Sequence, residues 1–156
     1  MNAYLIVKTL HILSSVLMVG TGFGSAFYLF FANRTRSVPA IAAVARLVVR
    51  ADWWFTTPAV LFQPASGLWL AHQADWPWQT PWIVATLALY AVAAACWLPV
   101  VGIQIEMAKL ARIAHAGGAA VLPDAYWRYA KTWERLGYPA FIAMLAVYFL
   151  MVVKPA

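Results

Sequence analysis

The sequence predicts an all-α membrane protein, a four-transmembrane-helix bundle, and three observations support that prediction. Of the 156 residues, 65% are hydrophobic and only 10% are charged, whereas about a quarter of the residues of a soluble domain carry charge. Four apolar segments approach the roughly 20 helical residues needed to cross about 30 Å of hydrocarbon. The basic residues gather in two connections between these segments. We therefore expect residues 1–156 to form a single four-helix transmembrane domain surrounded by lipid.

The first predicted span covers residues 4–31. Lys8 and His11 interrupt its apolar run and no convincing small-residue cleavage site follows, so we expect a membrane helix rather than a signal peptide. The second span covers residues 53–70, and an amphipathic lead-in precedes it from residue 40.

The third span covers residues 82–105, and its helix is expected to continue into the basic stretch 107–115. The fourth span covers residues 136–153, after a polar helical approach over residues 123–135. Up-and-down helices joined by short connections are the simplest arrangement for these four segments.

The basic residues predict the orientation of the bundle. Nine of the eleven Lys and Arg residues lie in or near two connections, which turn at residues 33–39 and 117–123. These nine are Arg34, Arg36, Arg46, Arg50, Lys109, Arg112, Arg128, Lys131 and Arg135. Only Lys8 and Lys154 belong to the other side. Because positively charged connections stay in the cytoplasm, both termini are expected outside it.

The composition also argues against several classes of site. The net charge of +6 is explained by the cytoplasmic connections, so we expect no nucleic-acid partner. The single cysteine, Cys96, rules out an intramolecular disulfide. No ligand set for zinc or a di-iron centre, no nucleophile motif and no phosphate loop is visible, so the catalytic residues are unknown.

Two prolines interrupt the second span. Pro58 and Pro64 have no N–H, so each is expected to bend the helix and free a backbone carbonyl within the bundle. Asp52, at the start of this span, is expected to pair with a nearby arginine at the interface.

His11 is the clearest candidate for chemistry, because ionisable side chains within hydrocarbon need a reason to be there. It belongs to a polar and small-residue stripe that recurs at spacings of three and four and faces other helices. The stripe contains Lys8, His11, Ser14 or Ser15, Met18, Gly22 and Ser25. His11 could hydrogen-bond a neighbouring helix, relay protons or ligate a haem iron.

Two further residues on the same side could join such a site. Lys8 lies one turn from His11, and could either extend to water or pair with a haem propionate. His72 closes the second span near a tryptophan-rich loop, and could be an interfacial histidine or a second iron ligand.

Several segments resemble the HemJ-type protoporphyrinogen oxidase superfamily, four-helix membrane proteins of bacteria. The first span carries a Lys-x-x-His pattern at Lys8 and His11. The second span carries Thr-Pro-Ala at Thr57 and Gly-Leu-Trp at Gly67, and a Val-Lys-Pro motif follows Val152. The likeness covers both ends and the second helix, and each motif alone is a weak signal.

The resemblance implies a haem b bound through His11, with electrons from protoporphyrinogen IX passing to the respiratory chain through a carrier such as quinone. It also implies a bacterial inner (plasma) membrane, with multiple passes and periplasmic N- and C-termini. One position departs from the family pattern, because Thr86 stands where the family carries a functional lysine. Threonine supplies neither a positive charge nor a base near neutral pH. We therefore expect the chain to retain the haem site but to lack the oxidase activity.

The whole chain is similar to a sibling group of uncharacterised bacterial integral membrane proteins. The segments that carry this likeness begin at Ala51, at Gln63 and at Trp97. Three classes of function therefore stay open. They are a haem b protein with a redox or electron-transfer role, a non-catalytic interaction subunit or assembly factor without a cofactor, and a small transporter. The last would need a homo-oligomer.

Overall fold

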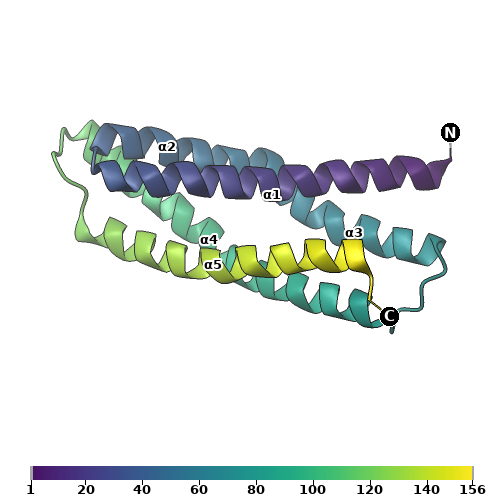
Figure 1. Ribbon diagram of the computed structural model, residues 1–156. Helices are drawn as coiled ribbons and strands as arrows, with labels where there is room; N and C mark the ends of the chain where they lie inside the picture. The colour runs from purple at the N-terminus through teal and green to yellow at the C-terminus, as the bar shows by residue number, and fades with distance from the viewer. Residues whose placement is uncertain (1, 156) are drawn as a thin grey trace.

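The computed structural model describes residues 2–155, and they form four long helical rods that run side by side (Figure 1). The elements in chain order are α1 (Ala3–Thr35), α2 (Val38–Ala51), the π-helical segment η1 (Asp52–Thr56), α3 (Thr57–Gln73), α4 (Pro81–Ala116) and α5 (Asp124–Val153). Because α2, η1 and α3 follow one another without a break, they make one rod. The all-α prediction is confirmed, and so is the order of the predicted helices.

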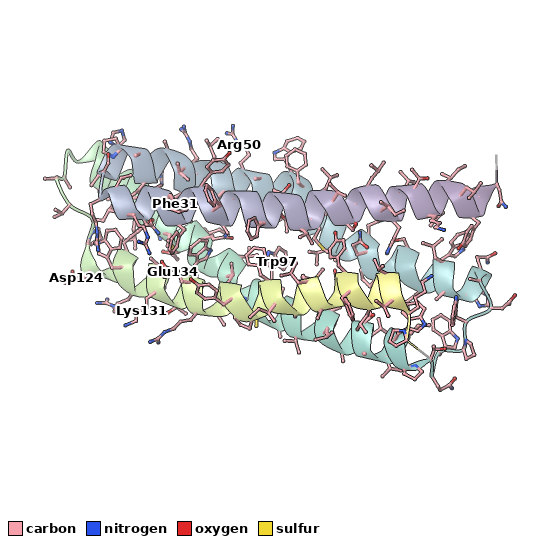
Figure 2. All side chains as sticks on the ribbon, in the orientation of Figure 1. Phe31, Arg50, Trp97, Asp124, Lys131 and Glu134 are labelled. Carbon is pink, nitrogen blue, oxygen red and sulfur yellow. The ribbon has the colours of Figure 1, made fainter. Side chains whose placement is uncertain are left out.

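The two ends of the bundle differ in what they carry. The basic end has the turn at Arg36 and Ser37 and the connection of residues 117–123, and the terminal end has both chain termini and the loop of residues 74–80. The labelled charged side chains Asp124, Lys131 and Glu134 lie toward the basic end, and Trp97 lies midway along the rods (Figure 2). The charged side chains therefore gather at the end of the bundle where the sequence places most of the Lys and Arg residues.

Local chemistry explains where the helices stop and start. The side chain of Asn2 accepts a hydrogen bond from the Tyr4 N–H at 3.1 Å and caps α1. Arg36 ends this helix in the left-handed conformation, with φ of 57°. Pro39 and Pro81 occupy first-turn positions of α2 and α4, where the missing N–H costs no helical bond. The turn between α1 and α2 therefore comprises only Arg36 and Ser37, and it is shorter than the predicted turn at residues 33–39.

Three helices, α1, α4 and α5, are long and apolar enough to cross a membrane. The segment predicted as the remaining span corresponds to η1 and α3, and α3 alone has 17 residues. At 1.5 Å per residue, the 36 residues of α4 extend about 54 Å, against about 30 Å of hydrocarbon. About 20 Å of the bundle therefore extends beyond the lipid chains.

The main apolar core lies in the part of the bundle near the basic end. Ile41, Met107 and Tyr126 are completely buried there, and they join α2, α4 and α5. Midway and toward the terminal end, large apolar side chains such as Ile142, Leu145 and Phe149 point outward and are about two-thirds exposed. This contrast is expected of a helical protein that packs like a soluble bundle at one end and faces lipid over the rest.

Pro64 shows how a freed backbone carbonyl is satisfied inside the bundle. Proline cannot donate to the carbonyl four residues earlier, which belongs to Val60. The hydroxyl of Tyr90, on α4, donates to that oxygen at 2.6 Å. The sequence prediction that a proline would free a carbonyl within the bundle is confirmed here, and the freed group links α3 to α4.

The core at the basic end contains a buried hydrogen bond between α1 and α5. The Tyr126 hydroxyl donates to Asn33 Oδ1 at 2.6 Å, and both residues are buried. Tyr126→Phe leaves that oxygen buried without a donor, so we expect the free energy of unfolding to fall by about 1–2 kcal/mol. Thermal unfolding of the purified protein in detergent measures the change. Tyr129→Phe is the matched control, because Tyr129 is 38% exposed, and equal effects in both variants would contradict the prediction.

Candidate functional site

Helices α1 and α3 meet along a polar strip at which His11 is central. Gln63 Nε2 donates to the backbone carbonyl of His11 at 2.8 Å. The His11 ring approaches the same helix one turn further on, with its Nδ1 2.7 Å from Ser66 Oγ. Gln63 and Ser66 are buried and His11 is half-buried. His11 thus joins α1 to α3 through both its backbone and its ring, which agrees with the hydrogen-bonding role considered from the sequence.

The surroundings of Ser66 determine which ring nitrogen of His11 carries the proton. Ser66 Oγ lies 2.7 Å from the carbonyl oxygen of Phe62 as well as 2.7 Å from His11 Nδ1. A carbonyl oxygen only accepts, so the single hydroxyl hydrogen of Ser66 goes to Phe62 and His11 Nδ1–H donates to Ser66. A neutral imidazole has one N–H, so its Nε2 keeps a lone pair. Metal-binding histidines are commonly held in this way, by a hydrogen bond from the other nitrogen.

Gly67 lets the imidazole ring lie close against α3. A Cβ atom at this position would lie 3.2 Å from His11 Cε1 and 3.9 Å from both ring nitrogens. Any larger residue would push the ring away from Ser66. The Gly-Leu-Trp segment noted in the sequence therefore has a local packing reason for its glycine.

A second polar level lies one turn further into the bundle. Met18 Sδ and Tyr90 Oη are 4.0 Å apart, and α1 and α4 run in the same direction. Ser14 and Thr86 each precede this contact by four residues, so the helical repeat places them on the same faces at a similar level. Both hydroxyls are buried, and neither has a hydrogen-bond partner within residues 2–155. Thr86 therefore projects into the interior that the His11 face of α1 also borders.

Lys8 and His72 lie toward the terminal end, and both are exposed. Lys8 Nζ is 5.8 Å from the centre of the Tyr4 ring on its own helix. The His72 ring stacks on Trp78, with centroids 6.4 Å apart. His72 follows Ser66 by six residues, or about 9 Å along α3. Their assignment to the cofactor site stays a prediction.

Asp52 begins the π-helical segment η1, and its partners differ from those expected. Thr56 Oγ1 donates to its Oδ1 at 2.9 Å. Gln104, with its amide nitrogen toward Asp52, donates to Oδ2 at 2.6 Å and accepts from Trp133 Nε1 at 3.2 Å. No arginine pairs with Asp52 among residues 2–155, so the predicted ion pair is wrong. Asp52 is only 5% exposed and faces the bundle, where two neutral donors, Thr56 and Gln104, replace the arginine.

Pro58 explains why the wide turn occurs at this place. Its missing N–H and its ring are incompatible with a normal α-helical bond to the carbonyl four residues earlier. The Thr57 N–H instead bonds to the Asp52 carbonyl, five residues back. Such π-segments recur at functional sites. The proline is visible in the sequence, whereas the wide turn beside it and the hydrogen bond between Asp52 and Thr56 are seen only in the structure.

The donor set can be compared with the metals a membrane helix could hold. No group of three or more His, Cys, Asp or Glu side chains in residues 2–155 is placed to hold a metal ion. A lone histidine suffices for iron where a porphyrin supplies the four equatorial nitrogens. His11 is the candidate for that ligand, because its Nδ1 is directed to Ser66 and its Nε2 is not.

Together, the outward-facing apolar helices and the polar groups enclosed among them define an integral membrane protein with an all-helical bundle. The chain matches the family described as "Predicted integral membrane protein (DUF2269)" over residues 5–155, and it belongs to that family. No curated protein and no solved structure matches the chain. The predicted likeness to uncharacterised membrane proteins agrees with this family, and the likeness to the HemJ-type superfamily stays a prediction.

The close approach of His11 and Gly67 can be tested by a double-mutant cycle. Gly67→Ala places a methyl group 3.2 Å from His11 Cε1, so we expect a loss of about 1–3 kcal/mol from overpacking. In a His11→Ala background the ring is absent, and the same alanine should cost little. Thermal unfolding in detergent gives both values. Gly102→Ala is the control, because an added Cβ there meets nothing within 4 Å, and additive effects of the His11 and Gly67 changes would refute the placement of the ring.

Proposed function

We propose that this protein binds haem b in the membrane, with His11 Nε2 as an axial iron ligand, and that it has a redox or electron-transfer role. The observation that carries the proposal is the hydrogen bond from His11 Nδ1 to Ser66 Oγ, at 2.7 Å, which leaves Nε2 unprotonated. A bound haem supplies one-electron chemistry, and the protein supplies ligation, orientation and the surrounding dielectric.

The residues around His11 have distinct parts in this proposal. Ser66 fixes the tautomer and the ring plane, and Gly67 leaves the space in which the ring lies. Lys8 is the candidate partner of a propionate, and His72 is the candidate second ligand. The buried hydroxyls of Ser14 and Thr86, which have no partner within residues 2–155, are available for polar groups of the macrocycle or for water.

The proposal includes a location and an orientation. The second rod would cross the membrane with α1, α4 and α5 and complete a four-span bundle in a bacterial inner membrane. The basic end would face the cytoplasm and the termini the periplasm. His11 would then lie in the periplasmic half of the bilayer, within reach of a membrane-soluble electron carrier such as a quinone.

The first test is a reduced-minus-oxidised absorption spectrum of protein purified from haem-replete cells, with a pyridine haemochrome assay for stoichiometry. We expect a b-type signal at about one haem per chain. His11→Ala should abolish it, because the iron loses its protein ligand. Ser66→Ala should weaken haem affinity by roughly 10- to 100-fold, because it removes the acceptor that orients the ring.

His115→Ala serves as the control for this experiment. His115 is exposed at the basic end, so its loss should leave the spectrum unchanged. Colourless wild-type protein that elutes as a folded species would refute the haem proposal, and so would a full haem signal in His11→Ala.

A second test concerns the oxidase activity of the superfamily that the sequence resembles. We expect that the chain does not restore growth without added haem in cells that lack protoporphyrinogen oxidase. The reason is that Thr86 offers a neutral hydroxyl where the resemblance implies an amine. A Thr86→Lys variant, checked for expression in the same strain, shows whether the amine alone is missing. Growth supported by the wild-type chain would overturn this expectation.

The alternative is an interaction subunit or assembly factor without a cofactor. Gly20 and Gly24 favour it, because a Cβ added at either position meets no atom within 4 Å. That part of α1 is therefore free to receive another helix, and small residues at this spacing allow close approach. Folded protein without haem would make this alternative the leading one.

A further inference from the structure

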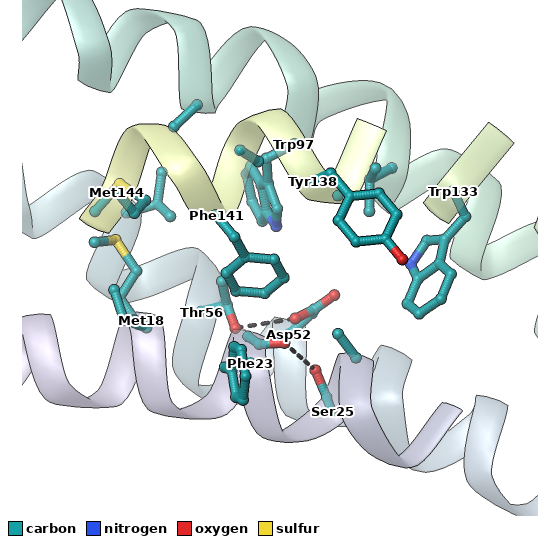
Figure 3. A pocket seen from close by; sticks show the side chains of 18 of the residues that line it. Met18, Phe23, Ser25, Asp52, Thr56, Trp97, Trp133, Tyr138, Phe141 and Met144 are labelled. Atoms are coloured by element: carbon teal, nitrogen blue, oxygen red, sulfur yellow. Dashed lines mark hydrogen bonds between the residues drawn. The ribbon is translucent and has the colours of Figure 1, made fainter. Parts of the chain in front are cut away.

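A cavity of about 360 Å³ lies midway along the bundle, beside Asp52. It is bordered by α1, η1, α3, α4 and α5, and Figure 3 shows the side chains around it. On α1 its lining begins at Met18, two turns beyond His11, and His11 does not border it. The cavity is therefore separate from the proposed haem ligand.

The cavity forms where α1 and α5 fail to pack closely. Helix α1 packs on α2, η1 and α3, and α5 packs mainly on α4. The rings of Phe23 and Phe141 meet edge to face across this seam, with centroids 5.4 Å apart (Figure 3). Because this part of the bundle is surrounded by lipid in the proposed orientation, a membrane-soluble compound has a direct way in between the two helices.

The charges that border the cavity are all of one sign. Asp52 and Glu134 line it, and none of its lining residues is a lysine, arginine or histidine, although the chain has 11 Lys and Arg residues. Asp52 is 95% shielded from solvent, and its two known partners, Thr56 and Gln104, are neutral. A carboxylate has about four lone-pair sites, so these two hydrogen bonds leave it free to accept more. In its ionised form this group is solvated by dipoles, and no cationic side chain lines the cavity beside it.

The walls of the cavity are rich in aromatic rings. Eight of its lining residues have aromatic rings, which come from α1, α4 and α5. They are Phe23, Phe27, Phe30, Tyr90, Trp97, Trp133, Tyr138 and Phe141. Aromatic faces attract cations as well as apolar groups, and the attraction increases where water is excluded. A carboxylate enclosed by aromatic rings favours a ligand that is both positively charged and apolar.

We propose that this cavity binds lipophilic monocations, compounds whose single positive charge is carried by an aryl or alkyl body, such as quaternary ammonium or phosphonium ions. Asp52 provides the counter-charge at the floor of the site. Trp97 and the rings from α1 and α5 enclose the body. The π-segment at Asp52–Thr56 positions the carboxylate, because its wide turn brings Thr56 to Oδ1 while Gln104 holds Oδ2. Neutral apolar compounds gain only the contacts with the walls, and anions are repelled.

The test uses two probes of the same shape and opposite charge, tetraphenylphosphonium and tetraphenylborate. Binding of each to the full chain in lipid nanodiscs is measured by equilibrium dialysis with labelled probe, and empty nanodiscs give the partition background. We expect saturable binding of the phosphonium at about one per chain, and no saturable binding of the borate.

Variants of Asp52 show whether the carboxylate is responsible. Asp52→Asn keeps the shape and removes the charge, so phosphonium affinity should fall about tenfold or more. Asp52→Glu should retain most of it. Glu106→Gln is the matched control, because Glu106 is an exposed partner of Lys109 outside the cavity. If Asp52→Asn fails to fold, as judged by size exclusion and circular dichroism, Trp97→Leu against Trp97→Phe tests the aromatic wall, and only the leucine should weaken binding.

Three outcomes would overturn the proposal: no saturable phosphonium binding to the wild type, equal binding of the two probes, or an undiminished affinity in folded Asp52→Asn. The second outcome would indicate an apolar cavity indifferent to charge. His11→Ala should bind phosphonium as the wild type does, so that failure of the haem proposal and failure of this one are separate results.

Discussion

A buried backbone carbonyl or N–H needs a hydrogen-bond partner, and this constraint determines how α1, α3 and α4 meet. Pro64 leaves the Val60 carbonyl without its helical donor, and Tyr90 supplies one from α4 at 2.6 Å. Gln63 donates across to the His11 carbonyl at 2.8 Å and brings α1 to the same region of α3. These two bonds hold α1, α3 and α4 in one register. The placement of His11 against Ser66 depends on that register.

The bundle uses two kinds of packing along its length, and the cavity lies where they meet. Near the basic end, α2, α4 and α5 bury large side chains such as Ile41, Met107 and Tyr126. Further along, lipid is as apolar as the side chains, so burial between helices gains little and hydrogen bonds or close contacts must hold them. In this region helix α1 has such bonds to α3, whereas its hydrogen bond to α5, between Asn33 and Tyr126, lies at the basic end. The seam between α1 and α5 is therefore the part of the bundle least closed by packing.

Helix positions could be predicted from the sequence because each depends on a local property. Apolar length sets the spans, and prolines and polar residues set their ends, so the helices expected around residues 82–105 and 136–153 appear within α4 and α5. The partner of Asp52 depends instead on which residue of a distant helix lies opposite. Four nearby arginines made an ion pair the simple expectation, whereas the wide turn at Pro58 directs the carboxylate inward to Gln104. Neither that turn nor the resulting cavity has a signal in hydrophobic periodicity.

For His11, the structure adds the hydrogen-bond partner that the sequence could not indicate. The sequence identified a buried histidine and left three roles open, because its spacing gives a face but no partner. The two 2.7 Å contacts of Ser66 select a tautomer, and a tautomer distinguishes a proton donor from a metal ligand.

Helix α1 connects the two sites, since one face of it serves both. His11, near the terminal end, contacts α3, Met18 contacts α4, and Gly22 and Ser25 border the cavity. The contacts of His11 and Met18 are made through hydrogen-bonded or closely packed groups. The part of α1 at Gly22 and Ser25 instead borders the cavity between α1 and α5. A movement of the part of α1 that borders the cavity relative to α5 would change the volume beside Asp52, whereas the bonds at Gln63 and Ser66 hold one end of this helix and the Asn33–Tyr126 bond holds the other. The cavity thus borders the stretch of α1 that lies between its hydrogen bonds to α3 and its hydrogen bond to α5.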